Sequence, residues 1–431
     1  MITGTTAAEI AHSVRALRER GLLRPGDVLP PVRELAATLG VNRNTAVAAY
    51  RQLAQAGLVV SRGRAGTIVS GGESVAQEGT ADTVLRDVAS GNPDPALIPD
   101  PTPALSGIVG RAVLYGEPVI DSALEAWTRE WMLADLPRDD LSVVVTSGAV
   151  DAVERLLAQA LMRDDAVALE DPCFLASIHT VRLGGYRAVP VPVDDEGMTV
   201  DGLRAALEAG VRAIISTPRA QNPTGVSLSP ARAAALRAVL ADHPYVLIIE
   251  DDHFSLLSPH PYASLIGAEH QRYALIRSVS KFLGPDMCLA LAGTDPVTAQ
   301  RLAMRLSPGT TWVSHLLQRL AHAQLTDTDA RAQISQAAAH YAERNATFAA
   351  ALAERGIPTA STDGLSLWVR LDIPARIAAE RLMRRGWLAR TGDEFRLDES
   401  SPDSHHLRLT VHDLSDADAA HLIDDLAASH R

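Results

Sequence analysis

From about residue 88 onward, short apolar runs alternate with stretches of helical periodicity, and this alternation is the strongest constraint on the fold. Strands that are apolar along their whole length are typical of sheets buried on both faces, and helices between them are the connections that parallel strands need. We therefore predict an α/β fold with a mostly parallel sheet covered by helices on both faces. The expected strands are 141–146, 166–169, 188–193, 213–217, 246–249 and 273–278, and the expected helices include 149–162, 201–209 and 229–241.

The end of the chain has a different pattern. From roughly residue 330, an alanine-rich stretch predicts one long helix. Segments 365–371 and 406–411 then predict strands in a mixed region. These features indicate a small C-terminal α+β subdomain.

The first 70 residues predict a separate unit of three helices and a hairpin. Pro30-Pro31 suits the start of the second helix, Gly40 its end, and Asn42 the N-cap of the third. Two apolar runs, 58–60 and 67–69, flank a glycine-containing turn and predict the hairpin. This order is that of a winged helix-turn-helix. We divide the chain into a DNA-binding domain at 1–70, a small polar linker at 71–87 and a larger domain at 88–431.

The charge distribution favours nucleic-acid binding by the first domain. Residues 1–70 contain nine arginines and four acidic residues, a net charge of +5, whereas the whole chain carries −12. A basic module on an acidic body is typical of a nucleic-acid-binding head joined to another function. An ordinary solvated basic surface is the alternative, and the ordered helices and hairpin favour DNA.

Candidate DNA contacts follow from the winged-helix geometry, in which the third helix enters the major groove. The start of that helix offers short polar groups and one cation to base edges and phosphates, Arg33 and Arg51 could reach phosphates, and the hairpin tip could touch the minor groove. The candidate residues are Arg33, Asn42, Arg43, Asn44, Thr45, Arg51, Arg62, Gly63 and Arg64.

Lys281 is the single lysine among 40 basic residues. A guanidinium stays protonated and cannot attack a carbonyl, so arginine cannot replace lysine where a free amine must react. Survival by accident is the alternative, and it would place the lysine anywhere. Lys281 instead follows an expected strand in Arg277-Ser278-Val279-Ser280-Lys281, which makes it a candidate for covalent chemistry with an aldehyde.

Other polar residues follow expected strands in the order that a pyridoxal 5′-phosphate site requires. Asp251 could lie beneath a ring nitrogen, Asn222 could donate to a phenolic oxygen, and Ser278 could bond a phosphate. Ser147, Gly148 and Ala149 open a helix, where backbone N–H groups bind anions. Phe174 offers a flat apolar face to the ring.

The segment 29–69, beginning Leu-Pro-Pro-Val-Arg, resembles the DNA-binding head of GntR regulators, and residues 88–431 resemble fold-type I aminotransferases. Together they are similar to the MocR subfamily of GntR regulators. The resemblance implies pyridoxal phosphate bound to Lys281 as a Schiff base, with Asp251, Asn222, Ser147, Gly148, Ala149 and Ser278 around it. It also implies a homodimer in which Tyr115 reaches the partner subunit's phosphate, and an effector carboxylate held by Arg408 beside Gly91.

Two residues depart from the family pattern. His253 stands where members usually have tyrosine, and because histidine titrates near neutral pH, we expect pH-sensitive cofactor binding. Cys288 stands where an arginine usually grips the phosphate. Without that charge-assisted hydrogen bond we expect cofactor affinity to fall by about one to two orders of magnitude, unless another arginine substitutes.

Three functions remain open. The first is a cofactor-responsive transcription regulator that is not an enzyme, which the basic head favours. The second is an active aminotransferase with an appended DNA-binding module, which Lys281, Asp251 and Arg408 allow. The third is a DNA-binding scaffold that ignores pyridoxal phosphate, which Cys288 allows. Segments 170–174 and 251–254 are similar to subfamily members tied to pyridoxal kinase expression and imply a role in vitamin B6 metabolism.

Location follows from what the sequence lacks. No run of about 18 consecutive apolar residues predicts a membrane span, and the first residues do not have the pattern of a signal peptide. The two cysteines, Cys173 and Cys288, fit a reducing compartment. We expect a cytoplasmic protein whose partners are operator DNA, a second copy of the chain and pyridoxal phosphate, with an amino compound as a candidate second effector.

Overall fold

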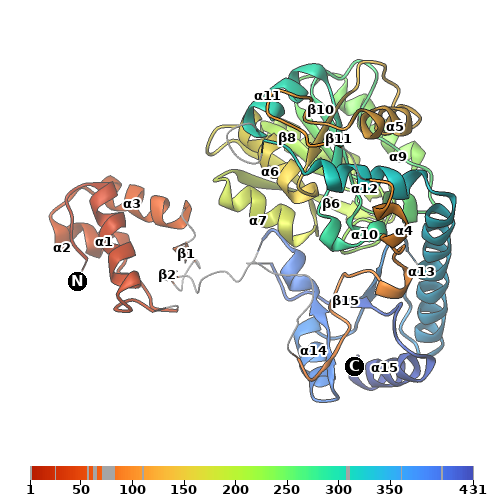
Figure 1. The fold of residues 1–431 in the computed structure, drawn as a ribbon. Helices are drawn as coiled ribbons and strands as arrows, with labels where there is room; N and C mark the ends of the chain where they lie inside the picture. Colours follow the sequence, from red (N-terminus) through yellow and green to blue (C-terminus); the bar gives the residue numbers. More distant parts are fainter. Residues whose placement is uncertain are drawn as a thin grey trace. The chain divides into compact units, whose positions relative to one another are not determined.

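The computed structural model describes residues 2–24, 26–55, 58–61, 66–69, 83–108, 111–306, 311–360, 362–398 and 401–430. It contains two compact units, a head within the first 77 residues and a larger body (Figure 1). The predicted DNA contacts Arg62, Gly63 and Arg64, and most of the predicted linker, lie outside the described residues.

The head has the predicted three helices followed by two antiparallel strands. These are α1 (Ala7–Glu19), α2 (Val32–Leu39), α3 (Arg43–Gln55), β1 (Val59–Ser61) and β2 (Thr67–Val69). Gly40 ends α2 in the left-handed conformation at φ 67°, and the Asn42 side chain accepts a hydrogen bond from the Asn44 N–H at 2.8 Å. Ile10, Leu35 and Leu53 are buried in one core cluster, so the unit packs around its own interior.

The body is built on one mixed, mostly parallel sheet with helices on both sides (Figure 1). The strand order is β4-β11-β10-β9-β8-β5-β6-β7. The bounds are β4 (Ser142–Thr146), β5 (Ala166–Asp171), β6 (Arg187–Asp194), β7 (Gly197–Met198), β8 (Val211–Ser216), β9 (Leu247–Asp251), β10 (Tyr273–Ser278) and β11 (Ala290–Thr294). Strands β10, β9, β8, β5 and β6 are parallel in that order, and each was predicted from its apolar run.

Helices cover this sheet and pack on one another in pairs, α6 on α11, α8 on α9 and α5 on α12. Their bounds are α4 (Thr102–Leu105), α5 (Ser122–Leu133), α6 (Ala149–Ala160), α7 (Leu175–Leu183), α8 (Val200–Glu208), α9 (Pro230–Leu240), α10 (Ser280–Leu283), α11 (Pro296–Leu306) and α12 (His315–Thr326). Among the described helices, none is long and apolar enough to cross a membrane.

Strand β11 was missed by the sequence prediction. It lies between β4 and β10 and is antiparallel to both. Its sequence, Ala-Leu-Ala-Gly-Thr, has small residues in place of the β-branched ones that signal a strand. A Cβ on Gly293 would come within 2.6 Å of Met132 Sδ and 2.7 Å of Leu141 Cδ1. The glycine weakens the strand signal in the sequence, and its lack of a side chain lets α5 pack on β11.

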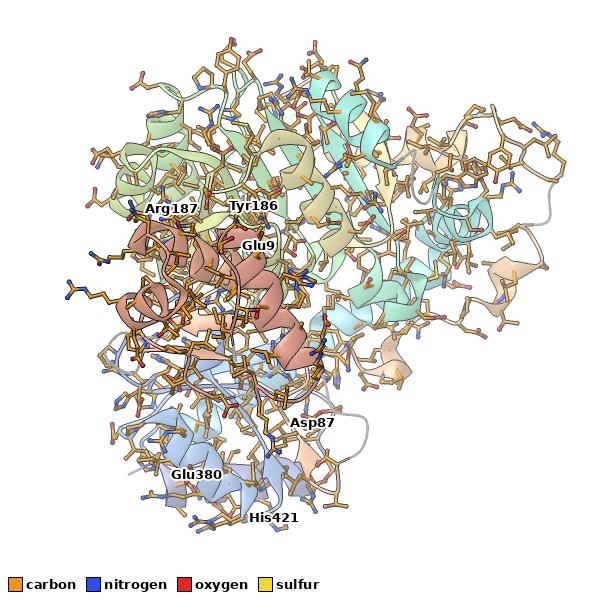
Figure 2. The ribbon with its side chains drawn as sticks, turned by 90° about the vertical axis from the view of Figure 1, so that its left-hand side faces the viewer. Glu9, Asp87, Tyr186, Arg187, Glu380 and His421 are labelled. Carbon is orange, nitrogen blue, oxygen red and sulfur yellow. The ribbon has the colours of Figure 1, made fainter. Side chains whose placement is uncertain are left out.

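The C-terminal subdomain contains the long helix α13 (Thr328–Glu354) and a sheet ordered β12-β15-β14. Its other elements are β12 (Ser366–Arg370), α14 (Ala375–Met383), β13 (Trp387–Leu388), β14 (Arg390–Thr391), β15 (His406–Thr410) and α15 (Asp416–Ser429). Glu380 on α14 and His421 on α15 mark two helices that pack side by side (Figure 2).

The first strand of the body, β3 (Arg86–Asp87), belongs to this subdomain, because it pairs with β13 in parallel.

Candidate cofactor site

The site lies at one edge of the large sheet because parallel strands bring their carboxyl ends together. Asp251 is the last residue of β9, and Lys281 follows the end of β10. Strand β11 is antiparallel, so Cys288, two residues before its first residue, comes to the same edge. Sequence order and strand direction alone therefore gather these side chains.

A cavity of about 330 Å³ opens at this edge, a volume suited to a small ligand. Nine of the ten residues predicted to bind the cofactor line it, all except Tyr115. The full lining is Ser147, Gly148, Ala149, Val150, Phe174, Thr217, Asn222, Asp251, His253, Ser278, Ser280, Lys281 and Cys288.

Val150, Thr217 and Ser280 were not predicted, although Thr217 is the last residue of the expected strand at 213–217 and Ser280 adjoins Lys281. Position at the end of a strand could have pointed to Thr217, because the predicted Ser278 also ends an expected strand. Val150 and Ser280 carry no comparable signal.

Lys281 lies on the short helix α10 and is half-buried. Its ammonium Nζ donates a hydrogen bond of 2.5 Å to the carbonyl oxygen of Gly91. Gly91, predicted to line the effector side, also lies beside Lys281 in a smaller adjoining cavity that contains Asn222 and His253.

Asp251 is a buried carboxylate directed at the cavity. Its Oδ1 has no hydrogen-bond partner among the described residues. Burial raises the pKa of Asp251 to about 7, the charge of Asp252 adds to the rise, and Lys281 opposes it. An unpartnered buried oxygen costs free energy, so this carboxylate is available to a hydrogen-bond donor that enters the cavity.

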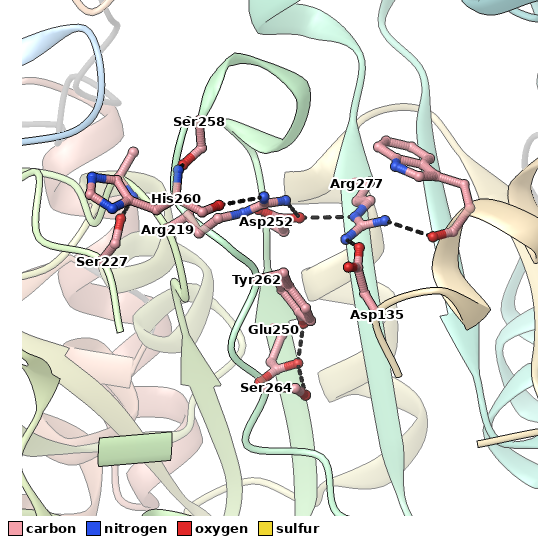
Figure 3. A network of polar contacts seen from close by, with 12 residues as sticks. Asp135, Arg219, Ser227, Glu250, Asp252, Ser258, His260, Tyr262, Ser264 and Arg277 are labelled. Atoms are coloured by element: carbon pink, nitrogen blue, oxygen red, sulfur yellow. Dashed lines mark hydrogen bonds and ion pairs between the residues drawn. The ribbon is translucent and has the colours of Figure 1, made fainter. Parts of the chain in front are cut away.

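The neighbouring Asp252 has the opposite environment (Figure 3). Its carboxylate accepts hydrogen bonds from Arg219 at 2.6 and 2.9 Å and from Arg277 at 2.9 Å. Although burial raises the pKa of Asp252, the charges of Arg277 and Arg219 lower it below the usual value. Adjacent aspartates are thus held in different states, one ionised within a buried ion network and one exchanging its proton near neutral pH.

Glu250, on the other side of Asp251, belongs to a second buried group (Figure 3). Its carboxylate accepts hydrogen bonds from Ser264 Oγ at 2.7 Å, from the Leu265 N–H at 2.5 Å and from the Tyr262 hydroxyl. Burial raises the pKa of Glu250 to about 7. These contacts fix the end of β9 and hence the direction in which Asp251 points.

One end of the cavity has the features of a phosphate site. Gly148, at φ 93°, lets the chain turn into α6 so that the backbone of Ser147 to Ala149 forms the helix N-terminus. The Ser278 hydroxyl donates to Ser280 Oγ at 3.1 Å nearby. Cys288 Sγ lies 3.5 Å from the Ser147 carbonyl oxygen, and among the described residues that line the cavity none is an arginine.

The loops that carry Phe174 and Asn222 are tied together. Gln221 Nε2 donates to the Pro172 carbonyl at 2.7 Å, and its Oε1 accepts from the Thr224 hydroxyl at 2.6 Å. Asn222 Oδ1 in turn accepts from Arg408 Nη1 at 3.1 Å. This contact fixes the Asn222 amide with its nitrogen directed away from Arg408.

Arg408, predicted to hold a carboxylate, is only 1% exposed on β15. Besides Asn222 it donates to the Ala89 carbonyl through Nη2 at 2.6 Å, and its guanidinium lies 5.0 Å above the Phe395 ring. A carboxylate bound by Arg408 would therefore share the five N–H donors of the guanidinium with Asn222 and Ala89.

Tyr115 lies apart from the cavity in the single chain. It is 87% exposed and its ring lies 5.3 Å from that of Trp312. In the head, Arg33, Asn42, Arg43, Asn44 and Arg51 are exposed and Thr45 is half-buried. The described structure gives Arg33, Arg43 and Arg51 no ion pair, so their charges face solvent.

Comparison with known proteins identifies both parts of the chain. Residues 6–69 match the family described as bacterial regulatory proteins, gntR family, and residues 82–426 match aminotransferase class I and II. The vitamin B6 salvage pathway transcriptional repressor PtsJ of Salmonella typhimurium is 46% identical over 428 residues, which cover 99% of both chains. The chain belongs to the MocR subfamily of GntR regulators. The predicted fold class and family are confirmed.

Two further matches to this MocR chain are a transcription regulator and an aminotransferase of known structure. The HTH-type pyridoxine biosynthesis transcriptional regulator PdxR of Corynebacterium glutamicum is 27% identical, with 65% of this chain and 64% of that protein covered. Among solved structures, LysN, the α-aminoadipate aminotransferase of Thermus thermophilus in complex with N-(5′-phosphopyridoxyl)-L-leucine, matches with a TM-score of 0.70. It is 22% identical and covers 80% of this chain and 92% of its own, a likeness that shows the fold.

Proposed function

We propose that the protein is a transcription regulator that binds operator DNA through its head, binds pyridoxal 5′-phosphate at Lys281 in its body, and controls vitamin B6 metabolism. The observation that carries the proposal is the cavity that joins the single lysine to the unpartnered carboxylate oxygen of Asp251. The B6-related regulators PtsJ and PdxR among its relatives support the pathway.

The residues present fit the cofactor. A carboxylate at Asp251 would hold a protonated ring nitrogen, which satisfies its free oxygen. The N-terminus of α6 with Ser278 would hold the phosphate, Phe174 would cover one face of the ring, and Asn222 would donate its amide to the phenolic oxygen. Once bound, pyridoxal phosphate supplies an aldehyde that reacts with amines and a ring that withdraws electrons.

We propose that the body senses its ligand without sustained turnover. Arg408 already donates hydrogen bonds to Asn222 and Ala89. Cys288 places a thiol where the family usually has an arginine that binds the phosphate. A weakly held, exchangeable cofactor suits a sensor. An active aminotransferase remains the second candidate because Lys281, Asp251 and Arg408 are all present, and an amino compound beside Gly91 would then be its substrate.

The regulator would act in the cytoplasm as a homodimer, in which the exposed Tyr115 reaches the partner's cofactor. Two heads would then read two half-sites, direct or inverted.

An absorbance titration of the purified protein with pyridoxal phosphate tests the proposal. We expect a yellow band in the wild type that is lost in Lys281→Ala. No band in either protein would favour the scaffold that ignores the cofactor. A coupled transamination assay tests the second candidate, since multiple turnovers with any amino acid would show an active enzyme.

A further inference from the structure

Residues 88–94, here called the strap, directly follow β3, the first strand of the body. Gly91, at the centre of the strap, is buried. The Gly91 carbonyl accepts the 2.5 Å hydrogen bond from Lys281 Nζ. The reactive amine of the site is therefore bonded to the backbone segment that leads, through β3 and the linker, to the DNA-binding head.

Side chains of the C-terminal subdomain hold the strap on both sides of Gly91. The Thr410 hydroxyl donates to the Ser90 carbonyl, and the Asn92 carbonyl lies 3.1 Å from His412 Nε2. Thr410 and His412 are both about 3% exposed, so water does not compete readily for these contacts.

The far end of the strap is tied to the long helix α13. The Asp94 N–H donates to the Tyr341 hydroxyl at 3.1 Å, and Tyr341 is 2% exposed. No side chain of the strap itself is needed for these ties, because they use its backbone. The strap is thus held by hydrogen bonds to buried side chains of the C-terminal subdomain, and the Lys281 contact lies between these bonds.

The near end of the strap continues into β3. Val88 is fully buried and its N–H donates to the Leu388 carbonyl at 2.9 Å. Arg86 stacks 5.0 Å above the Trp387 ring. A displacement of the strap would therefore act on the β3–β13 pair before it reaches the linker.

We propose that the contact between Lys281 and Gly91 is a latch that cofactor attachment opens; this inference rests on the proposed function. When the amine attaches to an aldehyde, its nitrogen forms a double bond to the aldehyde carbon. The aldehyde oxygen leaves as water with two of the three ammonium protons. At most one N–H remains, and it lies in the plane fixed by the new double bond. The Gly91 carbonyl loses its donor and the strap shifts between its ties.

Hydrogen–deuterium exchange of the full-length protein tests the latch directly. The reporters are strap amides that are bonded in the structure: Val88 to Leu388, Ala89 and Ser90 to Asp87, Asn92 to Ser90, and Asp94 to Tyr341. We expect their exchange to speed up about threefold or more on addition of pyridoxal phosphate. Lys281→Met without cofactor, which removes the donor but keeps the length of the side chain, should speed up the same amides.

The two arms separate the latch from the proposed function. If pyridoxal phosphate gives no absorbance band, the proposed function fails, and the Lys281→Met arm still tests the latch. If the band forms but neither the cofactor nor Lys281→Met changes strap exchange, the latch is overturned while cofactor binding stands.

A second experiment tests whether the ties transmit the change. Tyr341→Phe and Thr410→Val each remove one tie outside the cofactor cavity, and Tyr245→Phe, at a side chain that is 75% exposed, is the matched control. In the tie variants we expect a normal absorbance band but less than half of the wild-type change in DNA affinity on adding pyridoxal phosphate. A full response in both would overturn transmission through the strap.

Discussion

Asp251 is buried, lines the cavity and has a carboxylate oxygen without a hydrogen-bond partner among the described residues, and its burial makes the stability of the protein depend on pH. Burial raises its pKa from an ordinary value near 3.8 to about 7. Between these pH values the folded state keeps the proton that the unfolded state has lost. The free energy of unfolding should therefore fall as pH rises toward 7, and level off above it, with a contribution of at most ~1.4 kcal/mol per pH unit from this carboxyl.

Urea unfolding of the protein without added cofactor at several pH values from 6 to 8 checks this prediction. Asp251→Asn should show a shallower fall between pH 6 and 7 than the wild type, although Glu170 and Glu250, whose pKa values burial also raises to about 7, keep part of it. Asp195→Asn, which removes an exposed carboxylate, is the control. Equal slopes in Asp251→Asn and the wild type would contradict the assignment.

Cys288 is the residue at which the site departs from its family, and restoring the arginine is a direct test. Cys288→Arg should bind pyridoxal phosphate about 10- to 100-fold more tightly, since a charge-assisted hydrogen bond contributes about 1.5–3 kcal/mol. Cys288 already has φ 40°, so the backbone strain of a non-glycine residue there is unchanged. The dissociation constant from an absorbance titration is the measurement, with Cys288→Ser as control. An unchanged constant would place the phosphate elsewhere.

At the scale of elements, apolar runs predicted the parallel strands, because a strand buried on both faces must be apolar throughout. They did not predict β11, where Gly293 replaces a side chain that would collide with α5. Gly293→Ala should lower the free energy of unfolding by about 1–3 kcal/mol through overpacking. Gly267→Ala is the matched control, because its Cβ would meet only Arg237 Cδ, at 3.8 Å. Similar unfolding curves for the two variants would show that α5 shifts to accommodate the added methyl group and would contradict the prediction.

The candidate site was predictable to the extent that it depends on strand ends. Ser147, Asp251, Ser278 and Lys281 each follow an apolar run, and parallel strands bring such positions to one edge. The contact of Lys281 with Gly91 joins residues 190 positions apart through a backbone carbonyl, which has no sequence signature. The bond from Arg408 to the Ala89 carbonyl could not be foreseen for the same reason, and the bond from Arg408 to Asn222 joins side chains 186 positions apart.

At the scale of the whole molecule, the account requires a head that binds DNA and a body that changes this binding. Arg43, exposed at the start of α3, should contact DNA, so Arg43→Ala should weaken operator binding about tenfold or more at fixed salt. Arg204→Ala, an exposed arginine of the body, is the control for loss of one charge. Fluorescence anisotropy with labelled DNA measures both, and equal affinities would remove α3 from the interface.

The most direct test of the central claim is the affinity of the full-length protein for an operator selected by the protein itself, measured by anisotropy with and without pyridoxal phosphate. We predict that the cofactor changes the dissociation constant of the wild type severalfold and leaves that of Lys281→Ala unchanged. An equal response in both proteins, or none in the wild type when its absorbance band is present, would contradict the claim that attachment at Lys281 controls DNA binding.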